Sequence, residues 1–494
     1  MKIVHFLLPR IEYILFAAIF WGIASTGPII LNSDGDLPRH LLVGKLIRTT
    51  HTVHLTDIFS YRTTGFPSIP HEWLSQVIFS GFFDFLGLGG VVFLTALIVT
   101  IVWAIIYYDA LRRSDSLITA LMFTGLGVSA SLIHILPRPH LFSYIFTVLW
   151  ILVLEQIQKD KAHRWWLLPV LMIVWVNLHG MFVLGIVIWL IYLVGDLFEN
   201  PSKSWLTSPG TKAMLTGGAL SIIATFLSPT GVSIWGAIAS LGGNSYIKSR
   251  IPEYQSANFQ IPETWPFILI LLFAIVSFSR STNKTPWRHV FLVTAFAGVA
   301  LYSSRMLPFF AIVAVPITAQ AFSGWLKEDF PKNRIWTIEK NLNTTNHSSN
   351  GLIWVFTVIL AVALLFKLNI PIDVTSKGNA FSPQFFPVDA VTWLEANPQS
   401  GQMFNEFDWG GYILFKLWPQ YEIFMDGHTH IYGEKLTREY EQVITLSDNW
   451  ESILGKYQVT WAIVRVQSPV ARALESEGWK SLYQDKTANI LHRP

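Results

Sequence analysis

The sequence contains no cysteine and has few charged residues. Among its 494 residues there is no Cys, and Asp, Glu, Lys and Arg together make up 14%. The missing cysteine excludes disulfides, thiolate metal sites and cysteine nucleophiles. Soluble globular chains contain roughly 25% charged residues, so about half of the usual surface charge is missing. This composition excludes an ordinary water-soluble enzyme.

A long basic block is also missing. Lys and Arg number 35 against 32 Asp and Glu, which gives a net charge of +3. Proteins that bind nucleic acid through the phosphate backbone gather positive charge into patches. The balance therefore argues against nucleic acid as a partner.

Apolar residues are in excess, at 52% of the chain. Runs at 11–31, 91–108 and 351–368 come close to the roughly 20 apolar residues that span a bilayer. The first run is longer than a signal-peptide core and lacks a small-residue cleavage site, so we expect it to be a retained span. The many Trp and Tyr residues suit membrane interfaces. We predict a polytopic α-helical membrane protein.

Short basic loops orient the predicted spans. Cytoplasmic loops of membrane proteins carry an excess of Lys and Arg. We therefore expect the N-terminus in the cytoplasm and the C-terminus outside, with these basic residues in cytoplasmic loops: Lys2, Arg10, Arg112, Arg113, Lys159, Lys161, Arg164, Lys203, Lys212, Arg280, Lys284, Arg288, Lys327, Lys332, Arg334 and Lys340.

Two apolar stretches decide the number of spans. The stretch 73–87 is short, and 167–196 is too long for one ordinary span and is interrupted at His179. If the first crossed the membrane and the second were one helix, the basic loops between 112 and 164 would lie outside. We therefore expect 73–87 to lie along the outer interface and 167–196 to form two short helices that meet near His179. This gives about eleven spans.

Two regions have a non-membranous composition, the first outer loop and the C-terminal tail. We predict a membrane domain at 1–370, including an outer loop at 32–89, and a small extracytoplasmic α/β domain at 371–494. The tail is expected to form strands near 403–404, 422–425, 460–466, 480–483 and 488–492, and helices near 388–396, 435–444 and 471–476.

The tail also contains a short run of possible ligands. In an extended segment Asp426, His428 and His430 would share one side, an arrangement that could bind a metal. We favour the interpretation that these are ordinary polar residues of a loop at the end of a strand. Acidic and aromatic residues also suit sugar contacts, so acceptor recognition is a hypothesis for this domain.

The first outer loop begins with two aspartates at a predicted helix start. Ser33 or Asp34 can cap a helix at about 37–48, whose leucines form an apolar stripe that we expect to lie on the membrane. Arg39 and His40 follow Asp36 by three and four residues, which places all three on one helical face. The loop continues through Asp57, Arg62, His71 and Glu72.

These residues have a structural and a functional interpretation. An Asp before a helix is commonly a cap, and Glu72 in a first turn suits the helix dipole. The gathering of carboxylates, guanidinium groups and imidazoles against an apolar surface favours a functional site. Arg138, His140 and Arg305, in short outer turns, contact either headgroups or substrate. His179 in the broken helix either lines an acceptor pocket or satisfies a buried hydrogen bond.

Several segments resemble the GT-C superfamily of membrane glycosyltransferases. Within it the chain is similar to the protein mannosyltransferases (family 39) and the related aminoarabinose and galacturonic acid transferases, and the nearer likeness is to uncharacterised bacterial members. The similar segments are SDGDLPRHLLVGKLI, DIFSYRTTGFPSIPHEWLSQ, LPRPHLFSY, WVNLHGMFVLG, FNEFDWGGYILF and FMDGHTHIYG.

The resemblance implies hexosyl or pentosyl transfer, with inversion, from a polyprenyl-phosphate donor to an extracytoplasmic hydroxyl of a lipid, glycan or protein. It also implies a bacterial plasma (inner) membrane and an acidic base in the first outer loop, which corresponds to Asp34 or Asp36. Superfamily members often have adjacent acidic residues in this loop, whereas Gly35 separates them here. Which carboxylate acts, and whether a divalent metal takes part, stays open.

The residue types fit this reaction. A carboxylate can remove the acceptor proton as the new bond forms, and the departing lipid phosphate needs cations or a metal. Arginine binds phosphate bidentately, and a divalent ion could take oxygens from Asp34, Asp36 and Glu72. The candidate substrate-binding residues are Arg39, His40, Arg62, His71, Glu72, Arg138, His140, His179 and Arg305.

A transporter or flippase of a lipid-linked or small envelope substrate is the main alternative. Transporters usually place ionisable groups mid-span along a pathway, whereas Asp and Glu are nearly absent from the centres of these apolar runs. A membrane scaffold for envelope assembly would account for the tail but not for the first loop. Surface chemistry at the outer face is the favoured function.

Overall fold

The computed structural model describes residues 8–159, 161–202, 204–281, 284–372 and 378–494. Lys2 and Lys203 of the basic loops lie outside this part of the chain. The chain divides into two compact units. The helical unit comprises Met1–Ser25, Phe93–Ser228 and Ile251–Leu368, and the C-terminal unit comprises Thr26–Val92, Pro229–Arg250 and Asn369–Pro494. The first outer loop, which was expected to be part of the membrane domain, therefore clusters with the tail.

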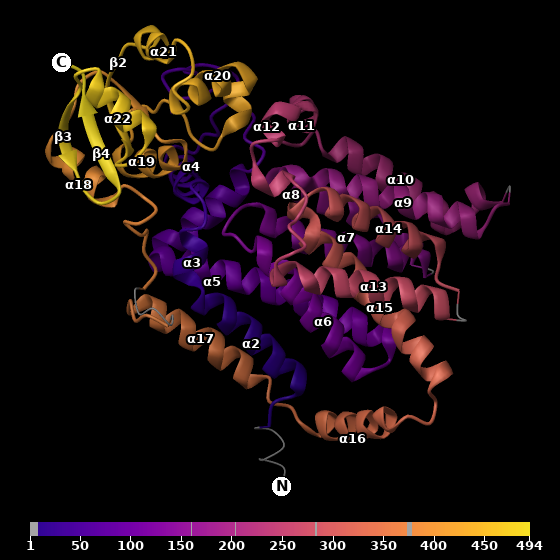
Figure 1. Cartoon of the computed structure of the whole chain (residues 1–494). Coiled ribbons are helices and arrows are strands. Elements are labelled where there is room, and N and C mark those ends of the chain that lie inside the picture. The colour runs from indigo at the N-terminus through magenta and orange to yellow at the C-terminus, as the bar shows by residue number, and fades with distance from the viewer. Residues whose placement is uncertain (1–7, 160, 203, 282–283, 373–377) are drawn as a thin grey trace. The chain divides into compact units, whose positions relative to one another are not determined.

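The helical unit consists of packed apolar helices (Figure 1). Its largest buried side chains include Trp103, Trp150 and Trp175. Neighbouring pairs include α6 with α15, α13 with α15, and α9 with α14. The helices are α2 (Ile11–Ser25), the second part of α5 (Trp73–Ser114), α6 (Leu117–Ser131), α7 (His140–Gln158), α8 (Leu167–Leu178), α9 (Val183–Glu199), α10 (Pro209–Ala224), α13 (Trp265–Arg280), α14 (Trp287–Tyr302), α15 (Leu307–Asp329), α16 (Arg334–Ser348) and α17 (Ile353–Lys367).

Six helical segments of the described chain are long and apolar enough to cross a membrane, or seven if α16 and α17, bent by 70°, form one span. The six are Trp73–Ser114, Leu117–His134, His140–Gln158, Gly180–Glu199, Pro262–Arg280 and Ser304–Asp329. Other expected spans, such as α2 and α17, have 15 residues. At 1.5 Å per residue they reach about 22 Å, less than the roughly 30 Å hydrocarbon core. The count of about eleven stays a prediction.

The predicted interruption of 167–196 near His179 is confirmed, and the place of 73–87 along the outer interface stays a prediction. α5 is broken at Gly87, whose φ of 63° and ψ of −152° are not helical, so 73–86 forms a separate helical segment. Glycine adopts a positive φ without steric cost. α8 ends at Leu178, His179 is extended, and α9 follows after a short 3-10 turn.

Helix α16 links loops that the basic residues assign to one side of the membrane. The Glu339 carboxylate accepts hydrogen bonds from the Ser116 hydroxyl (2.8 Å) and the Leu117 amide at the start of α6. The Asn346 side chain accepts the Ile11 amide (2.8 Å) at the start of α2. One helix thus satisfies backbone donors at two helix N-termini, a recognised stabilising arrangement.

The C-terminal unit contains a four-stranded sheet with strand order β1-β2-β4-β3 (Figure 1). β1 (Gln402–Asn405) runs parallel to β2 (Val459–Arg465), whereas β4 (Ala488–His492) is antiparallel to β2 and to β3 (Lys480–Gln484). The accompanying helices are α18 (Val388–Ala396), α19 (Gly410–Leu417), α20 (Thr429–Ile444), α21 (Trp450–Lys456) and α22 (Pro469–Ser476). Both faces of β2 are buried, since Trp461 and Ile463 belong to one apolar core and Val459 and Val464 to another.

One predicted strand, 422–425, is wrong. The amides of Phe424 (2.8 Å) and Met425 (3.4 Å) donate to the Asn405 side chain. The Ile423 amide donates to Phe59 O (3.0 Å) in the first outer loop, and Ile423 forms only an isolated bridge with Ser60. The segment therefore pairs with the outer loop rather than with the sheet.

The predicted helix after the aspartates is α4 (Asp36–Thr50). Its expected place on the membrane surface is not what the structure shows. Leu42 is buried in an apolar core with Tyr412 and Leu414 of α19, and Val43 and Leu46 pack against the same core. The apolar stripe of α4 is therefore covered by protein, because the tail provides a matching apolar surface.

Candidate functional site

Three separate segments meet at the start of α4 within the C-terminal unit. A β-carbon on Gly35 would lie 2.3 Å from the Asp408 carbonyl oxygen, and one on Gly411 would lie 2.6 Å from the Gly35 carbonyl oxygen. A β-carbon on Gly427 would lie 1.8 Å from an Asp36 carboxylate oxygen. Only glycine permits such close backbone contacts. The segments SDGD, FDWGG and MDGH, far apart in the sequence, thus surround the acidic pair.

The two aspartates of this pair have different surroundings. The Asp34 carboxylate accepts the Asp36 amide hydrogen (2.7 Å), so Asp34 acts as the expected cap even though Gly35 precedes the helix. The Asp36 carboxylate lies against the backbone of Gly427. Both aspartates are half-buried.

Arg39 lies in a buried ion cluster. Its Nε is 2.9 Å from Asp426 Oδ2, and its Nη2 is 3.9 Å from Asp57 Oδ1. Asp57 also accepts the Thr63 hydroxyl at 2.6 Å. Burial raises the pKa of Asp426, and the Arg39 charge opposes this rise. Two carboxylates thus face Arg39, and its expected contact with substrate stays a prediction.

Histidines and Glu72 form a second group beside Arg39. His71 Nε2 is 3.5 Å and His40 Nδ1 is 4.0 Å from Glu72 carboxylate oxygens. The His71 and His430 ring centroids lie 5.5 Å apart, and those of His428 and His430 lie 3.8 Å apart. The sequence placed His40 in a group with Asp36 and Arg39 and placed His71 and Glu72 in a second group, and the structure brings His40 to Glu72.

The two tail histidines are neutral at physiological pH. Burial, with the nearby Arg39 charge, holds the pKa of His428 well below its ordinary range. Burial, together with His71 and Arg39, lowers the pKa of His430 to about 3. A charged imidazole is costly in such a site because it loses its hydration.

Arg62 does not face a substrate site, contrary to the sequence prediction. Its side chain is 0% exposed. The guanidinium lies 4.0 Å from the Phe424 ring centroid and 4.7 Å from that of Tyr457, and it donates to Leu436 O and Glu439. Cation–π contacts and the Glu439 ion pair stabilise the buried charge, while the Nε and Nη1 atoms make no hydrogen bond within the described residues. Arg62 thus connects the outer loop to α20.

A cavity with about 510 Å³ of empty space opens beside α4. We call it the α4 cavity. One wall is apolar and includes Val43, Leu46, Ile47 and Phe59. The polar side chains that line it are Arg39, His54, Asp57, His71, Glu72, Gln76 and His428.

No group of three or more His, Asp or Glu side chains within the described ranges has an arrangement that could hold a metal ion. Asp34, Asp36 and Glu72 are thus not gathered into such a group. Asp426, His428 and His430 do not form one extended run, the condition for the metal alternative, because α20 begins at Thr429 and His430 is helical.

The helical unit contains a separate cluster around Glu253. Its carboxylate oxygens are 3.1 Å from Arg305 Nη1, 3.7 Å from Arg138 Nη1 and 3.8 Å from His134 Nδ1. The Tyr254 hydroxyl lies 3.0 Å from Arg305 Nη1. We call Arg138, Arg305, Glu253 and His134 the arginine cluster. The sequence predicted both arginines and missed Glu253 and His134.

His140 and His179 lie next to this cluster. The His140 and His134 ring centroids are 4.5 Å apart, and those of His140 and His179 are 6.4 Å apart. His179 Nδ1 pairs with the Ser143 hydroxyl at 2.9 Å, and Trp175 Nε1 donates to the same hydroxyl. His179 therefore satisfies a buried hydrogen bond, one of the two interpretations offered by the sequence.

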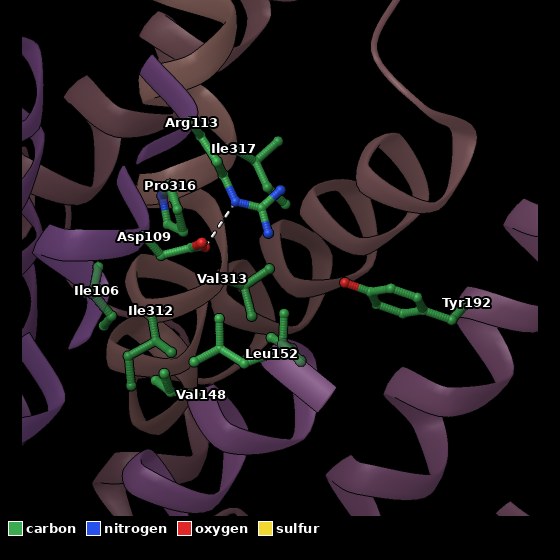
Figure 2. Close-up of a pocket in the computed structure, with 11 residues that line it drawn as sticks. Ile106, Asp109, Arg113, Val148, Leu152, Tyr192, Ile312, Val313, Pro316 and Ile317 are labelled. Atoms are coloured by element: carbon green, nitrogen blue, oxygen red, sulfur yellow. Dashed lines mark hydrogen bonds and ion pairs between the residues drawn. The ribbon is translucent and has the colours of Figure 1, made fainter. Parts of the chain in front are cut away.

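A further buried ionic group, not predicted from the sequence, borders a pocket with about 340 Å³ of empty space. Figure 2 shows Asp109 paired with Arg113 at one side of the pocket and Tyr192 on another helix. Glu155 accepts the Tyr192 hydroxyl (2.9 Å) and lies 2.6 Å from His289 Nε2. Ion pairs and hydrogen bonds join the charges of this group, so it holds α5, α7, α9 and α14 together.

Comparison with known proteins identifies the fold. No family model and no curated protein matches the sequence. Solved structures of the oligosaccharyltransferase from Archaeoglobus fulgidus do match. One, tethered with an acceptor peptide containing the NVT sequon, covers 92% of this chain and 69% of its own, with 12% identity and a TM-score of 0.58. Another, AglB in complex with an inhibitory peptide and a dolichol-phosphate, covers the same shares with 11% identity and a TM-score of 0.59. The apo form covers 92% and 70%, with 12% identity and a TM-score of 0.55. The chain thus shares the fold of this oligosaccharyltransferase.

Proposed function

We propose that this protein is a membrane glycosyltransferase that moves a sugar from a polyprenyl-phosphate donor to an extracytoplasmic hydroxyl. The observation that carries the proposal is the convergence of three distant segments on the acidic pair at the start of α4. The fold supports it, because the similar archaeal enzyme is an oligosaccharyltransferase that was solved with a dolichol-phosphate. The bacterial plasma membrane, with the N-terminus in the cytoplasm, belongs to the same proposal.

Asp36 is the base in this proposal. We assign the base to Asp36 because its carboxylate lies against Gly427 of another converging segment, whereas the Asp34 carboxylate accepts the Asp36 amide as a cap. Asp36 removes the acceptor proton while the acceptor oxygen bonds to the anomeric carbon. The bond between that carbon and the phosphate oxygen breaks, and its electron pair leaves with the lipid phosphate. One displacement of this kind inverts the anomeric centre.

The arginine cluster is the proposed phosphate site. Arg138 and Arg305 place two guanidinium groups against the Glu253 carboxylate. Guanidinium groups bind phosphate oxygens in pairs and stabilise the charge that develops on a leaving group. Glu253 positions both arginines before the donor arrives.

Transfer of labelled sugar by the purified full-length protein tests the proposal. With a polyprenyl-phosphate sugar as donor, Asp36→Asn is expected to lower turnover about 100-fold or more, the usual contribution of a general base. Asp34→Asn is expected to retain a larger share of activity. Asp84→Asn is the matched control, since Asp84 is partly exposed and paired with Arg48 at 2.6 Å. Full activity of both Asp34→Asn and Asp36→Asn would refute the proposal.

A further inference from the structure

The α4 cavity adjoins the proposed base. Asp36 lies against Gly427, and the next residue, His428, lines the cavity. The cavity lining is therefore continuous in the chain with the residue that Asp36 contacts.

Two imidazole nitrogens of residues that line this cavity have no partner in the structure. His54 Nε2 and His428 Nδ1 are buried and make no hydrogen bond within the described residues. Leaving a buried polar atom unsatisfied costs about 1–3 kcal/mol, and such atoms in a native protein call for a missing partner. A hydroxyl group serves either tautomer, because it both donates and accepts.

The charges of the cavity disfavour an anionic ligand. Arg39 is neutralised by Asp57 and Asp426, and Glu72 contributes another carboxylate. His428 is kept neutral by burial, which lowers its pKa. A phosphate or carboxylate entering the cavity would meet an arginine that already faces two carboxylates.

The remaining wall is apolar. Phe59 presents an aromatic ring, and Val43, Leu46 and Ile47 come from one side of α4. A sugar ring has the same dual character, with hydroxyls around its edge and C–H groups on its faces. The lining comes from helices and the outer loop rather than from the sheet, so the cavity offers no strand edge of the kind to which extended peptides add.

We propose that the α4 cavity binds the hydroxyls of a neutral carbohydrate, which makes the acceptor a glycan rather than a peptide or an anionic lipid. This inference rests on the proposed glycosyltransferase function. His54 and His428 hydrogen-bond the sugar edge, and Phe59 faces its C–H surface. The acceptor hydroxyl nearest Gly427 is the one that Asp36 deprotonates.

Saturation-transfer NMR on the full-length protein in nanodiscs tests the inference. The probes are the methyl glycosides of glucose, galactose, mannose and arabinose, glucose 6-phosphate, and a neutral serine tripeptide. We expect at least one neutral glycoside to bind, and glucose 6-phosphate and the tripeptide to bind at least tenfold more weakly. Failure of every neutral glycoside to bind, or tighter binding of the phosphate or the tripeptide, overturns the inference.

Variants assign the binding to the cavity. His54→Phe and His428→Phe keep a flat ring, remove the hydrogen bonds, and are expected to weaken glycoside binding at least fivefold. His54→Gln, which keeps a donor and an acceptor, is expected to bind more tightly than His54→Phe. His163→Phe, at an exposed histidine of η2 (Ala162–Trp166), is the matched control. Unchanged binding in both cavity variants, with unaltered melting temperatures, overturns the inference.

The outcomes separate this inference from the function on which it rests. Hydrolysis of the donor to free sugar and polyprenyl phosphate, with water as the acceptor in place of a glycoside, reports the glycosyltransferase site alone. Donor turnover without glycoside binding refutes the glycan acceptor and leaves the proposed function standing. Glycoside binding without turnover of any polyprenyl-phosphate donor refutes the proposed function instead.

Discussion

Replacing Arg39 by methionine tests the ion cluster that anchors the start of α4. Arg39→Met keeps much of the side-chain length and removes the charge that faces Asp57 and Asp426. Both carboxylates are almost fully buried, with side chains 2% and 1% exposed. Removing one partner of a buried pair leaves an uncompensated charge and costs about 3–5 kcal/mol.

This cost has a defined pH dependence. Burial already raises the pKa of Asp426 in the folded protein, and the loss of Arg39 removes the charge that opposes this rise. A carboxyl group with a raised folded-state pKa contributes stability at low pH and loses it as the pH rises through that pKa. The difference between Arg39→Met and wild type is therefore expected to be smaller near pH 5 than near pH 8.

The assay is the melting temperature of the detergent-solubilised full-length protein. For a unit as large as the C-terminal one, a loss of about 3–5 kcal/mol in the free energy of unfolding corresponds to a decrease in melting temperature of roughly 6–20 °C. Arg465→Met is the control, since Arg465 is 44% exposed in its pair with Asp408 and such surface pairs contribute about 0–1 kcal/mol. Arg39→Met/Asp426→Asn is expected to recover part of the loss. A loss no larger than that of Arg465→Met, or no recovery in the double variant, would refute the reasoning.

Three further predictions follow from other contacts. Glu339→Ala removes the acceptor for two donors at the start of α6 and is expected to lower the free energy of unfolding by about 1–2 kcal/mol. The control is Glu328→Ala, at an exposed position, which is expected to leave the melting temperature unchanged. Equal melting temperatures of the two variants would contradict this prediction. Arg62→Leu should lower the melting temperature of the protein and leave the KM of any remaining active fraction unchanged. A raised KM with an unchanged melting temperature would indicate instead that Arg62 contacts the substrate. Arg305→Gln should raise the donor KM at least tenfold and Glu253→Gln should raise it less, as substrate-saturation kinetics will show; an unchanged KM in Arg305→Gln argues against the phosphate site.

The regular elements of the tail could be predicted from sequence because their patterns are local. Strands near 460–466, 480–483 and 488–492 and the helix at 388–396 are confirmed. Helix α19 was missed, since it begins with Gly410 and Gly411, which are poor helix formers. The apolar run 422–425 looks like a strand, and only the Asn405 side chain and the outer loop reveal why it does not join the sheet.

The candidate site was predictable only in part. The spacing of Asp36, Arg39 and His40 on one helix is visible in the sequence, because it depends on helical periodicity alone. Glu253 has no local signal, since it meets Arg138 and Arg305 only after the chain folds. A buried arginine between two rings, such as Arg62, looks the same in sequence as one that faces a substrate.

The central claim is that the acidic pair at the start of α4 faces the extracytoplasmic side. The chain contains no native cysteine, so Ser33→Cys, at an exposed position next to Asp34, gives a single labelling site. In intact cells, a membrane-impermeant maleimide is expected to label Ser33→Cys fully, whereas a cysteine in place of the exposed Glu328 should be labelled only after the membrane is opened. Labelling of the Glu328 position in intact cells, together with protection of the Ser33 position, would contradict the claim.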